Sequence, residues 1–167
     1  MNRTPRIEKT SEIKLIGKKI RMSLAENQTR PLWESFMPRK KSISNTDGIE
    51  FYSVESYDDL GFFEKFDPAK EFEKWVAVKV TNFDNVPEDM EAFLIPAGLY
   101  AVFQYKGRPS EAQPTYQYIY SKWVPNSEYS LDHRPHFALM GEKYKGEDPE
   151  SEEELWIPIR SRNDEKR

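Results

Sequence analysis

A carboxylate and an indole two residues apart are the best candidates for chemistry in this sequence. Glu154 and Trp156 lie in the segment 154–159, ELWIPI, which is typical of a β-strand. Side chains alternate along a strand, so Glu154 and Trp156 share one face, opposite Leu155. Together they can bind a cation through charge and cation–π attraction. The alternative is a solvated charge that ends the acidic segment 147–153, and spacing alone favours it.

Two histidines, His133 and His136, lie on either side of Pro135. A nucleophilic triad needs a base that an acid orients, and a loop position is the simpler account of both residues. Their spacing is a weak metal signal without thiolates or a well-placed carboxylate. The sequence has no cysteine, no GxGxxG motif and no Walker loop. We therefore predict no metal and no cofactor.

Length and composition favour one soluble domain. The chain has 167 residues, 14% of them aromatic, so rings supply much of its apolar surface and either fill the core or line a cleft. The net charge of −4 argues against direct binding of nucleic acid. The sequence shows neither an apolar leader nor a membrane-length apolar run, so we expect a cytoplasmic protein that does not cross a membrane.

One order of elements, strand, helix, strand, strand, is predicted twice. The first copy, within residues 11–81, has its elements at 12–23, 29–37, 49–54 and 75–80. The second copy, within residues 98–161, has its elements at 98–105, 116–123, 137–142 and 155–159. In the first strand the apolar phase changes at Gly17, which indicates a β-bulge. Trp123 ends the apolar stripe of the second helix and is predicted to be structural.

Two such halves cannot each form a stable sheet alone, so we predict that they share one. The expected fold is α+β: one antiparallel sheet, two main helices on one face, and a cleft between halves related by an approximate two-fold axis. The domain is predicted to span residues 11–161. Residues 1–10 are expected to form a flexible arm and residues 162–167 a tail.

Four short motifs carry a resemblance to a known family. They are IPAGLYAVF at 95–103, YIYSKWVP at 118–125, ELWIPI at 154–159, and Leu32-Trp33-x-x-Phe36 in the first half. Because these motifs occur in this order and spacing, the chain from about Glu12 to Arg160 resembles the GyrI-like, or AraC-type, effector-binding domain. That resemblance implies the duplicated fold described above.

The resemblance also implies a site. Family members bind lipophilic, often cationic, molecules between the halves, and Glu154 matches their acidic residue. Burial among rings is expected to raise the pKa of Glu154. The expected ring contacts are Trp33, Tyr52, Trp75, Tyr118 and Trp156, with Phe103 and Phe137 behind them.

Three functions follow from the resemblance. The first is binding, as sensing or sequestration, of a small aromatic or cationic molecule. The second is hydrolysis of a strained or electrophilic molecule, such as a cyclopropane-bearing toxin, with Glu154 as the catalytic residue. The third is interaction with a protein such as DNA gyrase or a separate regulator. Only a short arm precedes the domain, without a helix-turn-helix segment, so we expect no direct control of a promoter.

Overall fold

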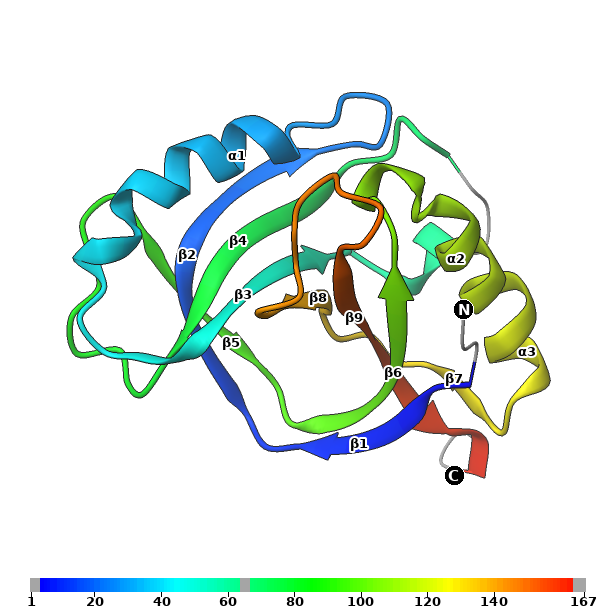
Figure 1. Cartoon of the computed structure of the whole chain (residues 1–167). Coiled ribbons are helices and arrows are strands. Elements are labelled where there is room, and N and C mark those ends of the chain that lie inside the picture. The colour runs from blue at the N-terminus through cyan, green and yellow to red at the C-terminus, as the bar shows by residue number, and fades with distance from the viewer. Residues whose placement is uncertain (1–3, 64–66, 164–167) are drawn as a thin grey trace.

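A computed structural model describes residues 4–63 and 67–163, in which nine antiparallel strands form one curled sheet (Figure 1). The strand order is β1-β6-β9-β8-β3-β4-β2-β5, and β7 pairs with β9. The strands are β1 (Arg6–Thr10), β2 (Ile13–Met22), β3 (Thr46–Ser56), β4 (Phe72–Val80), β5 (Glu91–Ile95), β6 (Gly98–Lys106), β7 (Tyr129–Leu131), β8 (His136–Met140) and β9 (Glu152–Ser161).

The two ends of this strand order meet, so the sheet closes on itself. β1 runs directly into β2, and β5 runs directly into β6. Arg6–Thr10 pairs with Gly98–Val102, and Ile13–Gly17 pairs with Glu91–Ile95, in the same register. The two bent strands therefore pair on both sides of the bend, and the sheet curves around a concave side (Figure 1).

Two helical segments lie on the convex side of the sheet, as predicted (Figure 1). The first is α1 (Thr29–Phe36), followed by the 3-10 segment η1 (Met37–Ser42). The second runs through α2 (Gln113–Tyr118), the π-helical turn η4 (Ile119–Trp123) and α3 (Val124–Asn126). Pro114 lies in the first turn of α2, where a missing N–H breaks no helix hydrogen bond.

The predicted duplication is visible in the topology. In the first half α1 follows β2 and packs against β2 and β4, with Leu32 and Phe36 buried. In the second half α2 and η4 follow β6, and Ile119 is buried in a cluster with Leu155 of β9. The element orders β2-α1-β3-β4 and β6-α2-β8-β9 are therefore equivalent.

Gly17 marks a change of buried face without a bulge, so the predicted bulge is wrong. The register of β2 with β4 is unbroken from Leu15 to Met22. Ile13 and Leu15 belong to the concave cluster, whereas Ile16 belongs to the convex cluster under α1. Glycine is needed because a Cβ at this position would collide with the backbone of Val76 and Ala77.

Both ends of the chain differ in part from the predicted arm and tail. Residues 6–10 of the segment 1–10 form β1 and pair with β6. Residues 1–3 of that segment, and residues 164–167 of the tail 162–167, lie outside the described residues. The segment between the two halves, residues 82–97, contains β5, which pairs with β2.

Candidate functional site

Glu154 lies on the concave side of β9, where three side chains donate hydrogen bonds to it. Arg6 Nη1 and Gln104 Nε2 lie 3.0 Å and 2.8 Å from Glu154 Oε2. Trp156 Nε1 donates to Glu154 Oε1 at 3.1 Å, so the two residues share a face as predicted from strand alternation. The Glu154 side chain is 23% exposed. The carboxylate is thus accessible, and it is already hydrogen-bonded within the chain.

These donors reverse the expected pKa shift of Glu154. Burial raises the pKa of this carboxyl, but hydrogen bonds from Arg6, Gln104 and Trp156 outweigh burial, and the net pKa lies below the ordinary value. The expectation of a raised pKa is wrong because it considered the rings around the carboxyl and not the donors. Glu154 is therefore a charged carboxylate at neutral pH.

An aromatic cluster extends from Trp156 across the concave face. Trp156 stacks on Phe137, with ring centroids 5.1 Å apart and planes 16° apart. Phe137 also packs against Tyr52, with ring centroids 5.3 Å apart. Tyr100 contacts both Phe137 and Trp156, with ring centroids at 5.3 Å and 5.7 Å. The structure therefore brings together three predicted ring residues, Tyr52, Phe137 and Trp156.

Tyr100 is a member of this cluster that the sequence analysis did not select. It lies in the IPAGLYAVF motif, from which Phe103 was selected instead. On β6, Tyr100 and Val102 belong to the concave cluster, whereas Ala101 and Phe103 belong to the convex cluster. Strand alternation from Gln104 was the available signal.

An open, acidic cavity of about 520 Å³ borders Glu154. Its lining residues are Glu50, Gln104, Leu139, Gly141, Glu142, Lys143, Glu152, Glu153 and Glu154. Five of these are glutamates and one is a lysine, so the local field favours a cation. Glu152, Glu153 and Glu154 begin β9, so the start of this strand lines the cavity, which the acidic composition alone did not predict.

Trp75 belongs to the same concave core cluster as these rings, and its own ring neighbour is Phe93. It is buried, packs against Phe93 with ring centroids 4.6 Å apart, and donates from Nε1 to Glu73 Oε1 at 2.6 Å. Its acidic neighbour is Glu73 of β4. The structure therefore places this predicted ring in the first half, beside a different carboxylate from Glu154.

Three other predicted ring residues lie on the convex side. Trp33 of α1 meets Phe51 edge to face, with centroids 5.5 Å apart, and Phe103 packs against Trp123 at 5.3 Å. Tyr118 of α2 packs against the convex cluster. Phe103 alternates with Gln104, so it faces away from Glu154, and the helices cover the same convex side.

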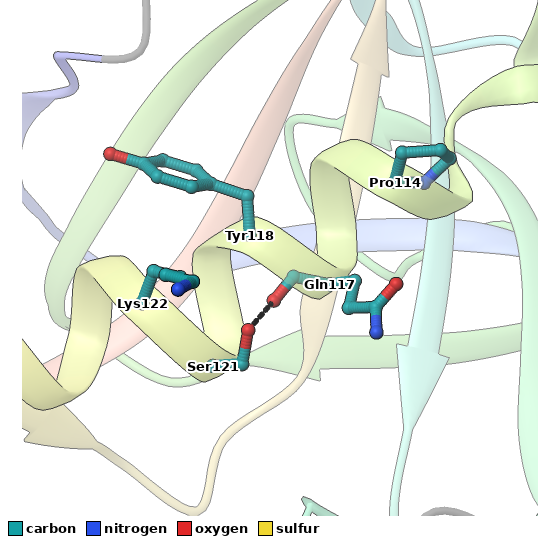
Figure 2. A pocket seen from close by; sticks show the side chains of 5 residues that line it. All are labelled: Pro114, Gln117, Tyr118, Ser121 and Lys122. Carbon is teal, nitrogen blue, oxygen red and sulfur yellow. Dashed lines mark hydrogen bonds between the residues drawn. The ribbon is translucent and has the colours of Figure 1, made fainter.

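Tyr118 lines a separate, shallow cavity of about 270 Å³ on the outer surface of the helix (Figure 2). The other lining residues are Pro114, Gln117, Ser121 and Lys122. Ser121 Oγ donates to the backbone carbonyl of Gln117 within this surface (Figure 2). Sequence spacing alone does not distinguish this outward helix face from the cleft, which explains the selection of Tyr118.

His136 is buried at the start of β8, so the expectation of a loop position is wrong for this residue. Its Nδ1 lies 2.9 Å from the Tyr120 hydroxyl. Burial lowers the pKa of His136 to about 3, so the ring is neutral. His133 is exposed, and its Nε2 lies 3.0 Å from the Tyr57 carbonyl.

Neither a metal site nor a membrane-spanning helix is found in the described part of the chain. No group of three or more His, Asp or Glu side chains there is arranged to hold a metal ion. Within residues 4–63 and 67–163, no helix is long and apolar enough to cross a membrane.

Comparison with known proteins places this geometry in context. The chain is 30% identical over 130 residues to the transcriptional regulator BrlR of Pseudomonas aeruginosa. The match covers 77% of the chain but 45% of the regulator, so the chain spans less than half of that relative.

Two solved structures show the same fold at low sequence identity. The structure of SAV2435 bound to tetraphenylphosphonium has a TM-score of 0.70 at 14% identity, covering 93% of each chain. A hydrolase encoded by lin2189 from Listeria innocua has a TM-score of 0.57 at 12% identity, covering 95% of this chain and 92% of the other. The family model for the GyrI-like small molecule binding domain matches residues 3–160, and the chain therefore belongs to that family.

Proposed function

We propose that the concave cleft binds small lipophilic molecules, aromatic or cationic, with Glu154 as the charged contact. One observation carries this proposal: an accessible carboxylate lies at the edge of a ring cluster and beside an acidic cavity. Trp156, Phe137 and Tyr52 are the proposed ring contacts. Apolar rings with one well-placed charge are typical of small-molecule sites.

The relatives support the same chemistry. SAV2435, which shares the fold, was solved bound to tetraphenylphosphonium, a lipophilic cation with four phenyl rings. The negative cavity and the stacked rings of Trp156 and Phe137 suit such a molecule. Because the pKa of Glu154 is lowered, the charge of Glu154 itself should change little from about pH 6 to pH 8.

Calorimetric titration with tetraphenylphosphonium tests the proposal. Glu154→Gln keeps the size of the side chain and removes its charge. We expect it to weaken binding of the cation by about 1 to 2 kcal/mol, the loss of one partly exposed charged contact. Binding of the neutral triphenylphosphine oxide should stay the same.

Glu150→Gln is the matched control for net charge. Glu150 is an exposed acid of the segment 147–153 and pairs with Lys106 at 2.9 Å. This variant should bind the phosphonium as the wild type does. Equal affinity of the wild type and Glu154→Gln for the phosphonium would contradict the proposed role of Glu154.

A hydrolase is the second candidate, because the lin2189 structure shows that this fold also occurs in a protein described as a hydrolase. Glu154 would then activate water, although its lowered pKa makes it a weak base. Turnover of an electrophilic small molecule that Glu154→Gln abolishes would support it. Recovery of unchanged compound after tight binding would favour the binding function.

A protein partner such as DNA gyrase is a separate proposal that rests on the family resemblance alone. We also propose that the chain does not bind DNA directly, given its net charge of −4. A supercoiling assay with and without the chain tests the gyrase partner. A mobility-shift assay with duplex DNA tests the second point.

A further inference from the structure

We propose that Arg6 determines the specificity of the cleft, as an internal cation that a cationic ligand must displace from Glu154. The proposal rests on the proposed function and adds a residue that the sequence analysis placed in a flexible arm. It makes the first described strand of the chain part of the binding site. Its test therefore separates the role of Arg6 from the role of Glu154.

The guanidinium of Arg6 makes both contacts that a ligand cation would make. Arg6 Nη1 donates to Glu154 Oε2 at 3.0 Å. Arg6 Cζ also lies 5.6 Å from the ring centroid of Trp156, within the range of cation–π attraction. A cation that binds Glu154 and Trp156 in the same way therefore competes with Arg6 for the same two groups.

Displacement of Arg6 is feasible because its side chain is held only partly by Glu154. The Arg6 side chain is 43% exposed, so it is partly hydrated while it is paired. Its Nε also donates to Glu8 Oε1 at 2.8 Å, and this contact lies within β1. After displacement, Arg6 can keep Glu8 as its partner and need not become an unpaired charge.

The place of β1 in the sheet also favours displacement. β1 lies at one end of the strand order and pairs with β6 over Arg6–Thr10. Arg6 is at the outer end of this pairing, opposite Val102. A change of the Arg6 rotamer there leaves the strand pairing of residues 7–10 intact.

The charge of the ligand then decides what Arg6 does. A monocation at Glu154 with Arg6 in place would put two positive groups at one carboxylate, so Arg6 weakens its binding. A neutral ring compound competes with Arg6 for the ring of Trp156 but meets no charge repulsion from it, so Arg6 weakens its binding less. An anion of the same shape gains attraction from Arg6. The cleft with Arg6 therefore discriminates less strongly for cations than the cleft without it.

Three probes of related shape test this dependence on ligand charge. They are the cation tetraphenylphosphonium, the neutral triphenylphosphine oxide and the anion tetraphenylborate. For Arg6→Gln, calorimetry should show about tenfold tighter binding of the phosphonium, the change expected for one charged contact. The affinity for the phosphine oxide should change less than the affinity for the phosphonium, and binding of the borate should weaken. Arg6→Lys keeps the charge and should preserve the wild-type order.

Lys9→Gln is the matched control on the same strand. Lys9 is exposed and pairs through its backbone with Leu99. The substitution removes one positive charge without changing the donors to Glu154. This variant should bind all three probes as the wild type does. An equal gain in phosphonium affinity for Lys9→Gln and Arg6→Gln would mean that net charge, not the Arg6 contact, sets the preference.

The outcomes separate the two proposals. In one outcome, Glu154→Gln weakens phosphonium binding, but Arg6→Gln leaves it unchanged or weakens it. That outcome overturns the role of Arg6 and leaves the proposed function standing. If the phosphonium binds to Arg6→Gln but not to the wild type, both the role of Arg6 and the proposed function are supported. If the phosphonium binds to neither the wild type nor Arg6→Gln, and thermal unfolding shows that both proteins are folded, both proposals are overturned.

Discussion

Strand β4 in the first half and strand β9 in the second half each carry a glutamate and a tryptophan two residues apart on the concave face. The indole Nε1 donates to the glutamate in both, at 2.6 Å for Trp75 and Glu73 and at 3.1 Å for Trp156 and Glu154. A basic side chain lies over each indole, Lys19 at 5.5 Å and Arg6 at 5.6 Å. The pseudo-repeat therefore contains the same arrangement twice.

The two arrangements differ in what covers the tryptophan. Trp75 is 2% exposed, and Phe93 of β5 packs on it. In the first half, Trp75 pairs with Lys19 of β2, and Phe93 of β5 pairs with Leu15, four residues before Lys19. In the second half, Trp156 pairs with Val102 of β6, and Thr10 of β1 pairs with Gly98, four residues before Val102. Thr10 therefore holds the position equivalent to Phe93. Thr10 is small, and Trp156 is left half-buried. The first half thus covers its tryptophan with a ring of its own, and the second half leaves its tryptophan partly exposed.

Replacement of each tryptophan by alanine gives the largest expected contrast. Trp75→Ala should lower the free energy of unfolding by about 3 to 5 kcal/mol, because it empties a fully buried volume. Trp156→Ala should lower it less and should weaken tetraphenylphosphonium binding more. Urea unfolding and calorimetric titration of both variants measure the two effects. Equal losses of stability and of binding in the two variants would show that the halves are functionally alike.

The buried residues that precede the two glutamates give the next contrast. Phe72 precedes Glu73, whereas Glu153 precedes Glu154, and both of these preceding side chains are buried. Burial raises the pKa of Glu153 to about 7, and its Oε2 has no hydrogen-bond partner among the residues that the structure describes. A raised pKa was predicted for Glu154, but the carboxyl whose pKa is raised is that of its neighbour Glu153.

Glu153 should make stability depend on pH. Its unfolded pKa is near the ordinary 4.5, so between about pH 4.5 and pH 7 the folded state keeps a proton that the unfolded state has lost. Stability should therefore fall as pH rises through this range, by about 2 to 3 kcal/mol. Glu153→Gln should remove this fall in urea unfolding at pH 5 and pH 8. The same pH dependence in the variant would assign it to other groups.

Periodicity was enough to predict the architecture. Alternation on the last strand predicted the shared face of Glu154 and Trp156, and the helical spacing through Trp123 predicted a stripe that does pack in the core against Phe103. These predictions succeeded because they depend on which face a residue shares with its near neighbours, and local geometry fixes that.

Contacts between distant segments were not predictable in the same way. Arg6 reaches Glu154 because β1 pairs with β6, and nothing in the local pattern of residues 1–10 indicates that register. Tyr118 and Phe103 were selected as rings near a family motif, but the face that each ring occupies depends on how the sheet curls. The lowered pKa of Glu154 has the same cause, since two of its three donors come from other strands.

The smallest expected effect concerns the carboxylate of the first half. Glu73→Gln removes the charge that pairs with Lys19 at 3.8 Å, but Lys19 keeps Glu91 at 3.3 Å, and the glutamine oxygen can still accept from Trp75 Nε1. The change in the free energy of unfolding should therefore be below about 1 kcal/mol, as for other exposed ion pairs. Tetraphenylphosphonium affinity should be unchanged, because Phe93 fills the place that a ligand ring would take. Urea unfolding and calorimetric titration, run beside Glu154→Gln, measure both quantities. A loss of phosphonium affinity in Glu73→Gln as large as that in Glu154→Gln would mean that the first half also binds ligand, and the proposed division between a closed and an open half would be wrong.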